Sequence, residues 1–216
     1  MELAGKKVLF LGDSITEGTG TSAPEFHYTS VFGALSGADV TAYGVGGTRI
    51  TPQKKPSAEP RWDLDFIQRA DGMREDADVV VVFGGTNDFG HADTVVGTES
   101  DREPTTFYGA CHTLFRKLLT KYSDATIVVM TPLHRTSEND LINEIGLPRE
   151  PLSTYVTALR KVATYYSLPV CDLYNVSGLQ PNVPIIQQKY MPDGLHPNDA
   201  GAARIAARLY GFLKSL

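Results

Sequence analysis

The sequence predicts a three-layer α/β/α sandwich that contains five strands in a mainly parallel sheet. Short runs rich in β-branched residues alternate with longer segments of helical periodicity, which is the pattern of a sheet covered by helices. One run, Asp78 to Phe83, is apolar without alternation, as is typical of a central parallel strand buried on both faces. The chain has 216 residues, so residues 1–216 are expected to form a single domain.

Five strands are expected at intervals along the chain: Lys7–Leu11, Asp39–Tyr43, Ala77–Phe83, Thr126–Thr131 and Pro169–Leu173. Parallel neighbours need long crossover connections, and the segments between these runs are long enough to hold helices. Right-handed crossovers would then place helices on both faces of the sheet.

Three of the connecting segments carry one-sided apolar stripes, which predict helices with a buried face. The stripe after Thr106 consists of Phe107, Cys111, Leu114, Phe115 and Leu118. The stripe after Thr154 consists of Tyr155, Leu159, Val162, Ala163 and Tyr166. The last, after Asn198, consists of Ala202, Ile205, Ala206, Leu209 and either Phe212 or Leu213.

Two polar segments do not fit the strand–helix alternation. Residues 51–61 contain three prolines and two lysines, and residues 134–151 contain many polar residues and two prolines. In open α/β sheets the ligand crevice lies beyond the carboxyl ends of the strands. Both segments follow such ends, so they are expected either to wall the ligand site or to be solvated surface loops.

Composition and charge exclude several classes of partner. The formal net charge is −5, whereas binding of nucleic acid or an anionic membrane favours clustered Lys and Arg. No segment approaches the roughly 20 apolar residues of a membrane span, and the N-terminal residues lack a signal-peptide pattern, so a cytoplasmic location is expected. The two cysteines, Cys111 and Cys171, are expected to be buried thiols rather than a disulfide.

Ser14 is the first candidate for chemistry. The stretch Gly12-Asp13-Ser14 directly follows the first predicted strand, which places Ser14 at the carboxyl edge of the sheet. A serine hydroxyl is a weak nucleophile and needs a base within hydrogen-bond reach. Without such a base, a serine at a strand end is usually a turn residue or a helix N-cap.

A partner for Ser14 occurs near the other end of the chain, in Asp193-Gly194-Leu195-His196-Pro197. A carboxylate three residues before a histidine in a turn can bond one ring nitrogen, and the other nitrogen then accepts the serine proton. Pro197 disfavours helical angles at His196. The histidine is therefore expected in extended backbone just before the last helix, for which Asn198 is the expected N-cap.

Donors for a developing oxyanion are expected at two other strand ends. The glycine-rich stretch Gly44–Thr48 follows the second strand, and Gly84-Gly85-Thr86-Asn87-Asp88 follows the third. Glycine allows a close approach of the backbone, and backbone N–H groups with an Asn side chain are frequent oxyanion donors. Each stretch taken singly is also a common structural turn.

These four stretches, in this order, resemble the sequence blocks of the SGNH (GDSL-type) hydrolases. The resemblance extends from Gly12 to Pro197 and implies a flavodoxin-like fold with five strands. It implies Ser14 as nucleophile and backbone donor, with Gly47 and Asn87 as the other oxyanion donors. It further implies His196 as base and Asp193 as its orienting carboxylate.

One block departs from the family pattern. Members often carry an Asn a few residues before the oxyanion glycine, where this chain has Ala42-Tyr43. Gly46 and Gly47 are therefore both candidates, and the spacing from the strand favours Gly47. The sequence has no Gly-x-Ser-x-Gly elbow, which counts against an α/β-hydrolase.

Further polar residues near strand ends are candidates for substrate contact, with solvated surface as the alternative: Asp13, Arg49, His134 and Arg135. Three aromatic residues are candidates for stacking on a sugar ring, with a role in the core or at the rim as the alternative: Tyr28, Trp62 and Phe89. Asp88 is expected to brace the Asn87 turn rather than to take part in chemistry.

The predicted function is hydrolysis of a small carboxylic ester through an acyl-enzyme, with a short acyl group on a sugar or other hydrophilic alcohol. Within the family a lysophospholipase or thioesterase is the alternative. A metal-dependent phosphoesterase, with Asp13, Asn87, Asp88, Asp193 and His196 as its ligands, is the weaker hypothesis, because the sequence lacks Asp-x-His and Gly-His-x-His ligand pairs. A non-catalytic carbohydrate-binding domain is the third hypothesis. No cofactor is expected, and the sequence does not indicate an oligomeric state.

Overall fold

A computed structural model describes residues 1–216, and its centre is a sheet of five strands in the order β2-β1-β3-β4-β5. The strands are β1 Lys7–Gly12, β2 Asp39–Gly44, β3 Val79–Phe83, β4 Thr126–Met130 and β5 Val170–Cys171. All four neighbouring pairs are parallel. The predicted five-stranded α/β fold is thus confirmed, with a sheet that is parallel throughout and with the apolar run ending at Phe83 as its central strand.

Nine α-helices connect or flank the strands: α1 Ser14–Glu17, α2 Tyr28–Ser36, α3 Phe66–Arg69, α4 Thr86–His91, α5 Phe107–Lys121, α6 Leu152–Tyr165, α7 Leu173–Val176, α8 Pro184–Tyr190 and α9 Asp199–Ser215. Three short 3₁₀ helices occur at Pro24–Phe26, Pro60–Asp63 and Ala70–Gly72. The three helices expected from apolar stripes are α5, α6 and α9. Thr106 and Asn198 cap α5 and α9 through side-chain oxygens, which is the role predicted for Asn198.

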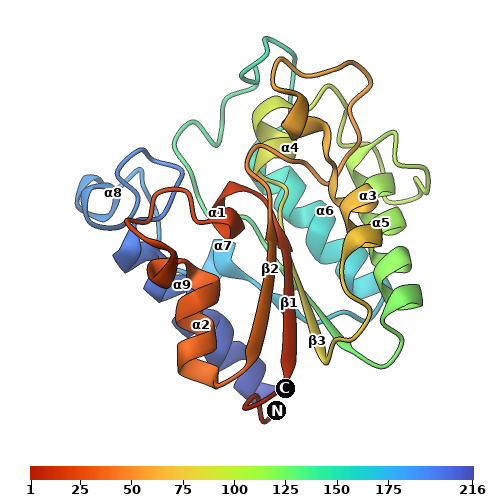
Figure 1. Cartoon of the computed structure of the whole chain (residues 1–216). Helices are drawn as coiled ribbons and strands as arrows, with labels where there is room; N and C mark the ends of the chain where they lie inside the picture. The colour runs from red at the N-terminus through yellow and green to blue at the C-terminus, as the bar shows by residue number, and fades with distance from the viewer.

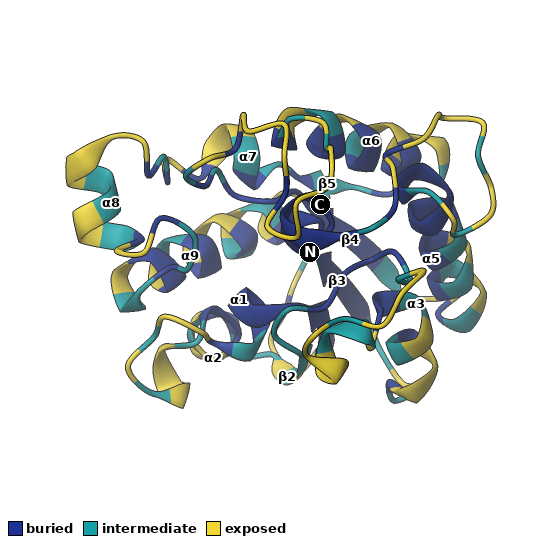
Figure 2. Ribbon diagram, turned by 90° about the horizontal axis from the view of Figure 1, so that it is seen from above, coloured by how far each residue is buried: buried dark blue, intermediate teal, exposed yellow.

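The helices form a layer on each face of the sheet (Figures 1 and 2). α3, α5 and α6 pack with one hydrophobic cluster, and α2 and α9 pack with the other. Alternate residues of the central strand divide between the two clusters, since Val80 and Val82 belong to the first and Val79 and Val81 to the second. Both faces of β3 are therefore buried, which explains why its sequence does not alternate.

The free cysteines lie on opposite faces of this sheet. Cys111 of α5 belongs to the first cluster and Cys171 of β5 to the second, and both are buried. The expectation of two buried thiols is confirmed. No helix is long and apolar enough to cross a lipid bilayer.

Helix α2 is an element that the sequence analysis did not predict. Its apolar core face consists of little more than Tyr28 and Phe32, and Gly33 and Thr29 lower its helix propensity. Tertiary packing holds it, because α2 lies against α9 and the edge strand β2. In α9, Leu213 rather than Phe212 completes the buried stripe.

The register of the sheet gathers the functional stretches at one edge. Gly12 at the end of β1 pairs with Gly44 of β2 and Phe83 of β3. Because parallel strands end at the same edge, the chain leaves all three strands at neighbouring points. Ser14, the glycine stretch and Asn87 follow directly after these three ends.

Candidate active site

Ser14 is the first residue of the short helix α1, which begins immediately beyond β1. Asp13 caps this helix, since its Oδ1 accepts a hydrogen bond from the Ile15 N–H at 3.0 Å. A side chain at Gly12 would overlap Thr16, so only glycine allows the strand to turn this tightly into the helix. The first N–H groups of a helix lack intrahelical partners, which leaves the Ser14 N–H available to a ligand.

The structure brings Ser14, His196 and Asp193 into one hydrogen-bonded line. Ser14 Oγ lies 3.0 Å from His196 Nε2, and His196 Nδ1 lies 2.7 Å from Asp193 Oδ2. The first two residues are 182 positions apart in the chain. This order of hydroxyl, imidazole and carboxylate is the arrangement that allows a serine to be deprotonated as it attacks.

The turn before α9 fixes the imidazole. Asp193 Oδ1 accepts the backbone N–H groups of Leu195 and His196 at 2.9 and 2.7 Å, so one carboxylate holds both the turn and the ring. Gly194, which follows Asp193 in this turn, has φ +79°, a conformation that favours glycine. These hydrogen bonds, together with the protonatable His196, lower the pKa of the Asp193 carboxyl, although desolvation opposes them.

The glycine stretch presents one free N–H beside the serine. The Gly46 N–H donates to Glu17 Oε2 at 2.8 Å, whereas the Gly47 N–H has no acceptor within the chain. A Cβ at Gly46 would lie 3.6 Å from Ser14 Cβ, and a Cβ at Gly47, whose φ is +77°, would overlap the Trp62 indole. Of the two glycines left open by the sequence, Gly47 is therefore the one with a free donor.

Asn87 follows β3 in helix α4, at the same sheet edge. Its Nδ2 donates to the Thr48 carbonyl at 2.9 Å, which ties the amide to the glycine stretch and leaves its second N–H free. Asp88 next to it accepts from the Ile50 and Thr51 N–H groups and from Thr51 Oγ1. The carboxylate of Asp88 thus has a structural role, but it ties the segment at Ile50 and Thr51 to α4 rather than bracing the Asn87 turn itself.

Two residues that support the site were missed by the sequence analysis. Glu17 accepts from Gly46 and from Arg61 Nη2, and it belongs to the same block as Ser14. Arg69 donates to the carbonyls of Gly12 and Tyr43 at 2.9 and 2.8 Å, so it joins the ends of β1 and β2. Arg69 stands in a region without a recognisable motif, whereas the position of Glu17 one helical turn after Ser14 was a usable signal.

Arg49, a candidate for substrate contact with solvated surface as the alternative, is buried within the chain. Its side chain is 1% exposed, with Nη1 2.6 Å from His91 Nδ1. Nη2 donates to the Trp62 carbonyl and to Asp63 Oδ1 at 3.0 and 2.9 Å. The guanidinium is used within the chain to fix the segment that carries Trp62.

Asp13 and Arg135, two further candidates for substrate contact, are buried as well. Asp13 is buried and caps α1, and burial raises the pKa of its carboxyl to about 6. Arg135 is buried too, with Nη2 on Glu144 at 2.7 Å and Nη1 on the Thr86 carbonyl at 3.2 Å. Neither side chain has a polar face turned to solvent.

Two of the three aromatic candidates lie in the core. Tyr28 is buried and its hydroxyl lies 2.9 Å from Thr16 Oγ1, and Phe89 is fully buried against Tyr155. Neither ring can reach a sugar. Trp62 is half-buried and remains available.

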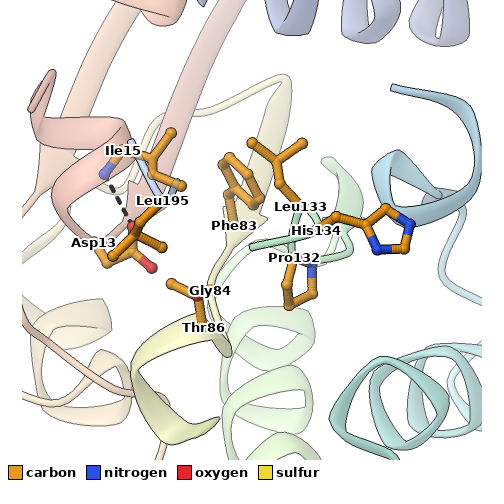
Figure 3. A pocket seen from close by; sticks show the side chains of 9 residues that line it. All are labelled: Asp13, Ile15, Phe83, Gly84, Thr86, Pro132, Leu133, His134 and Leu195. Carbon is orange, nitrogen blue, oxygen red and sulfur yellow. Dashed lines mark hydrogen bonds between the residues drawn. The ribbon is translucent and has the colours of Figure 1, made fainter. Parts of the chain in front are cut away.

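A narrow pocket lies behind the strand ends (Figure 3). It is lined by Asp13, Ile15, Phe83, Gly84, Thr86, Pro132, Leu133, His134 and Leu195 and has no room for a water molecule. His134 contributes to its wall, but the imidazole bonds Glu138 Oε2 at 2.8 Å and stacks on Tyr174. Substrate contact by His134 stays a prediction.

The polar segments at 51–61 and 134–151 do wall a wider pocket of about 330 Å³. It is lined from the first segment by Gln53, Lys55, Pro56, Ser57 and Ala58, together with Trp62, His91, Asp93, Ile145 and Leu147. The residues suggested as ligands of a phosphoesterase metal form no such site, because no group of three acidic, histidine or cysteine side chains has metal-binding geometry.

The arrangement at the sheet edge has the parts that acyl transfer needs. A hydroxyl contacts an imidazole, a carboxylate orients that imidazole, and N–H groups without a partner in the chain follow the neighbouring strand ends. This combination on a parallel α/β sheet defines a hydrolase of the serine type.

Comparison with known proteins gives the family. The model of the GDSL-like lipase/acylhydrolase family matches residues 10–204. The chain belongs to this family, and it is accordingly a serine esterase or acylhydrolase. No curated protein sequence matches it.

Several solved structures share the fold. A protein from Lactobacillus plantarum is 30% identical with a TM-score of 0.82, over 99% of this chain and 98% of that one. A lipase/acylhydrolase from Enterococcus faecalis is 21% identical with a TM-score of 0.67, over 97% and 96%. An acetyl xylan esterase is 22% identical with a TM-score of 0.63, over 95% and 98%.

Proposed function

We propose that Ser14 is the nucleophile of an acyl-enzyme mechanism, with His196 as general base and Asp193 as its orienting carboxylate. The observation that carries this proposal is the 3.0 Å contact between Ser14 Oγ and His196 Nε2, backed by the 2.7 Å contact between His196 Nδ1 and Asp193. In this scheme the N–H groups of Ser14 and Gly47 and the side chain of Asn87 bind the oxyanion.

The reaction proceeds in two halves. His196 Nε2 takes the Ser14 proton as Oγ bonds the ester carbonyl carbon, and the carbonyl oxygen becomes an oxyanion held by the three donors. The carbon–oxygen bond to the alcohol then breaks, and His196 returns the proton to the leaving oxygen. Water repeats the sequence on the acyl-enzyme, which releases the acid and restores the Ser14 hydroxyl.

We further propose a short acyl group, such as acetyl, on a sugar or another hydrophilic alcohol. The wider pocket of about 330 Å³ has polar as well as apolar lining residues, which suits a hydrophilic alcohol portion. A related fold serves an acetyl xylan esterase, which is compatible with this substrate class. A lysophospholipase or thioesterase of the same family would require room for a longer acyl group.

Hydrolysis of p-nitrophenyl acetate tests the nucleophile. Replacement of Ser14 by Ala removes the attacking oxygen, so kcat is expected to fall by a factor of about 10³ or more while the fold is preserved. The far-ultraviolet circular dichroism spectrum provides the folding control. Turnover near that of the unmodified protein in a folded Ser14→Ala variant would refute the assignment.

A rate series over p-nitrophenyl esters of increasing acyl length tests the substrate class. We expect the largest kcat/KM for acetate and a decline from butyrate onward, because additional methylenes have no matching pocket. A steep rise toward long chains would favour the lysophospholipase or thioesterase alternative.

A further inference from the structure

The wider pocket adjoins the residues proposed to bind the oxyanion. The Trp62 indole packs directly on Gly47 and also lines this pocket. His91, another lining residue, lies one helical turn after Asn87 in α4, and residues four apart share a helix face. If the carbonyl oxygen of an ester faces Gly47 and Asn87, the rest of the ester can therefore extend into this pocket.

The aromatic wall of the pocket is held by a buried cation. Trp62 and His91 stack with ring centroids 4.7 Å apart. Arg49 joins them, because Nη1 contacts His91 Nδ1 at 2.6 Å and Nη2 donates to the Trp62 carbonyl at 3.0 Å. Asp63 and Ser57 bond the same guanidinium. The indole is thus fixed in place before any ligand arrives, which reduces the entropic cost of binding.

The chemistry of the lining suits a sugar ring. The Trp62 indole lines the pocket, its N–H has no partner within the chain, and the exposed side chains of Ile145 and Leu147 extend the apolar wall. Lys55, whose ammonium group forms no ion pair, and the Asp93 carboxylate add polar groups at the rim. A few placed polar groups on an aromatic surface are typical of sites for small polar ligands.

We propose that this pocket binds the sugar ring of the ester's alcohol portion, with Trp62 as the residue on which the ring stacks. The inference rests on the proposed function and adds the place and orientation of the alcohol. A volume of about 330 Å³ is near the lower end of small-molecule pockets, roughly 300–1,000 Å³. It therefore matches a single ring rather than a lipid chain.

A bulky residue at position 147 tests the proposal by kinetics. Leu147→Trp fills the pocket, so the ratio of kcat/KM for an acetylated monosaccharide such as glucose pentaacetate to that for p-nitrophenyl acetate should fall by about tenfold or more. Ile142→Trp is the matched control, since Ile142 is exposed on the same segment outside the pocket. Its ratio should stay within about twofold of the unmodified protein.

Several outcomes would overturn the inference. An unchanged ratio of the two kcat/KM values in Leu147→Trp would do so. A change in Leu147→Trp that depends only on the acyl length of p-nitrophenyl esters would do so as well, because it would assign the pocket to the acyl group. Hydrolysis of p-nitrophenyl acetate without any hydrolysis of the sugar ester would also refute it while leaving the proposed function intact. If the unmodified protein showed no esterase activity at all, the proposed function itself would be refuted.

Fluorescence gives an independent readout, because Trp62 is the only tryptophan in the chain. In the Ser14→Ala variant, which should bind the ester without turning it over, addition of glucose pentaacetate is expected to change the emission in a saturable manner. An emission spectrum that does not respond to the sugar ester would contradict stacking on Trp62.

Discussion

Glu17 links helix α1, which begins with Ser14, to the turn that carries Gly47. Its two carboxylate oxygens are divided between the Gly46 N–H at 2.8 Å and Arg61 Nη2 at 2.6 Å. Charge-assisted hydrogen bonds of this kind are stronger than neutral ones. Because Gly46 is held by Glu17, the next N–H along the chain is the one left for a substrate oxygen, and Glu17 is a positioning residue.

Truncation of Glu17 tests this role. Glu17→Ala should lower kcat for p-nitrophenyl acetate by about tenfold, with a smaller change in KM, since the lost order affects the oxyanion more than the ground state. Glu17→Gln should recover most of the rate, because its amide oxygen still accepts from Gly46. Equal losses in the Gln and Ala variants would argue against positioning through this hydrogen bond.

At the scale of single residues, sequence reasoning succeeded where spacing has a chemical meaning. Asp193 and His196 stand three apart in a turn, and the structure places both in line with Ser14. It did not indicate that Arg49 and Arg135 are buried, because a charged residue after a strand end has the same local sequence whether its partners are water or side chains from distant segments. Asp63 and Glu144, which bind these arginines, are not recognisable as partners before the chain is folded.

At the scale of elements, the segment from Thr51 to Asp63 is fixed to α4 through buried polar contacts. Arg49 binds both His91 of α4 and Asp63 at the end of the segment. Burial and the neighbouring Arg49 lower the pKa of His91 to about 4, so the imidazole is neutral and accepts from the guanidinium. Protonation of His91 would place two cations side by side and break this connection.

The pH dependence of stability tests that connection. An unfolded histidine has a pKa of about 6.5, so between pH 6.5 and 4 the unfolded chain binds a proton that the folded chain does not. The stability contributed by neutral His91 is complete above pH 6.5 and is lost as the pH falls toward 4. The difference in free energy of unfolding between the unmodified protein and His91→Gln should therefore shrink from pH 7.5 to pH 5, by on the order of 2 kcal/mol.

Urea unfolding at the two pH values measures this difference. The comparison with His91→Gln removes the contributions of other groups, including Asp13, whose raised pKa of about 6 acts in the opposite direction. Parallel pH profiles for the two proteins would show that His91 is not held neutral by its surroundings.

Elements with strong periodicity were predictable, and elements held by tertiary contacts were not. The apolar stripes of α5, α6 and α9 repeat a pattern along the chain, and the five strands lie in short runs rich in β-branched residues. Helix α2 and the 3₁₀ turn at Pro60–Asp63 have too few apolar residues for such a signal. Trp62, carried by that turn, acquires its position from Arg49 and Gly47 rather than from its local sequence.

At the scale of the whole molecule, the parallel sheet brings the residues of the candidate site together. Three strand ends and the turn before α9 bring residues from positions 14, 47, 87 and 196 to one edge. The two hydrophobic clusters hold that edge from both faces. The sequence blocks that carry these residues lie far apart in the chain. Their convergence was predictable because parallel strands all end at the same edge of the sheet.

Covalent labelling tests whether Ser14 is the nucleophile. A fluorophosphonate reacts with a serine that an imidazole activates, so intact-mass measurement should show a single adduct, and peptide mapping should locate it at Ser14. The adduct should be absent from Ser14→Ala and form much more slowly in His196→Ala. An adduct on another residue, or esterase activity that survives complete labelling of Ser14, would contradict the account.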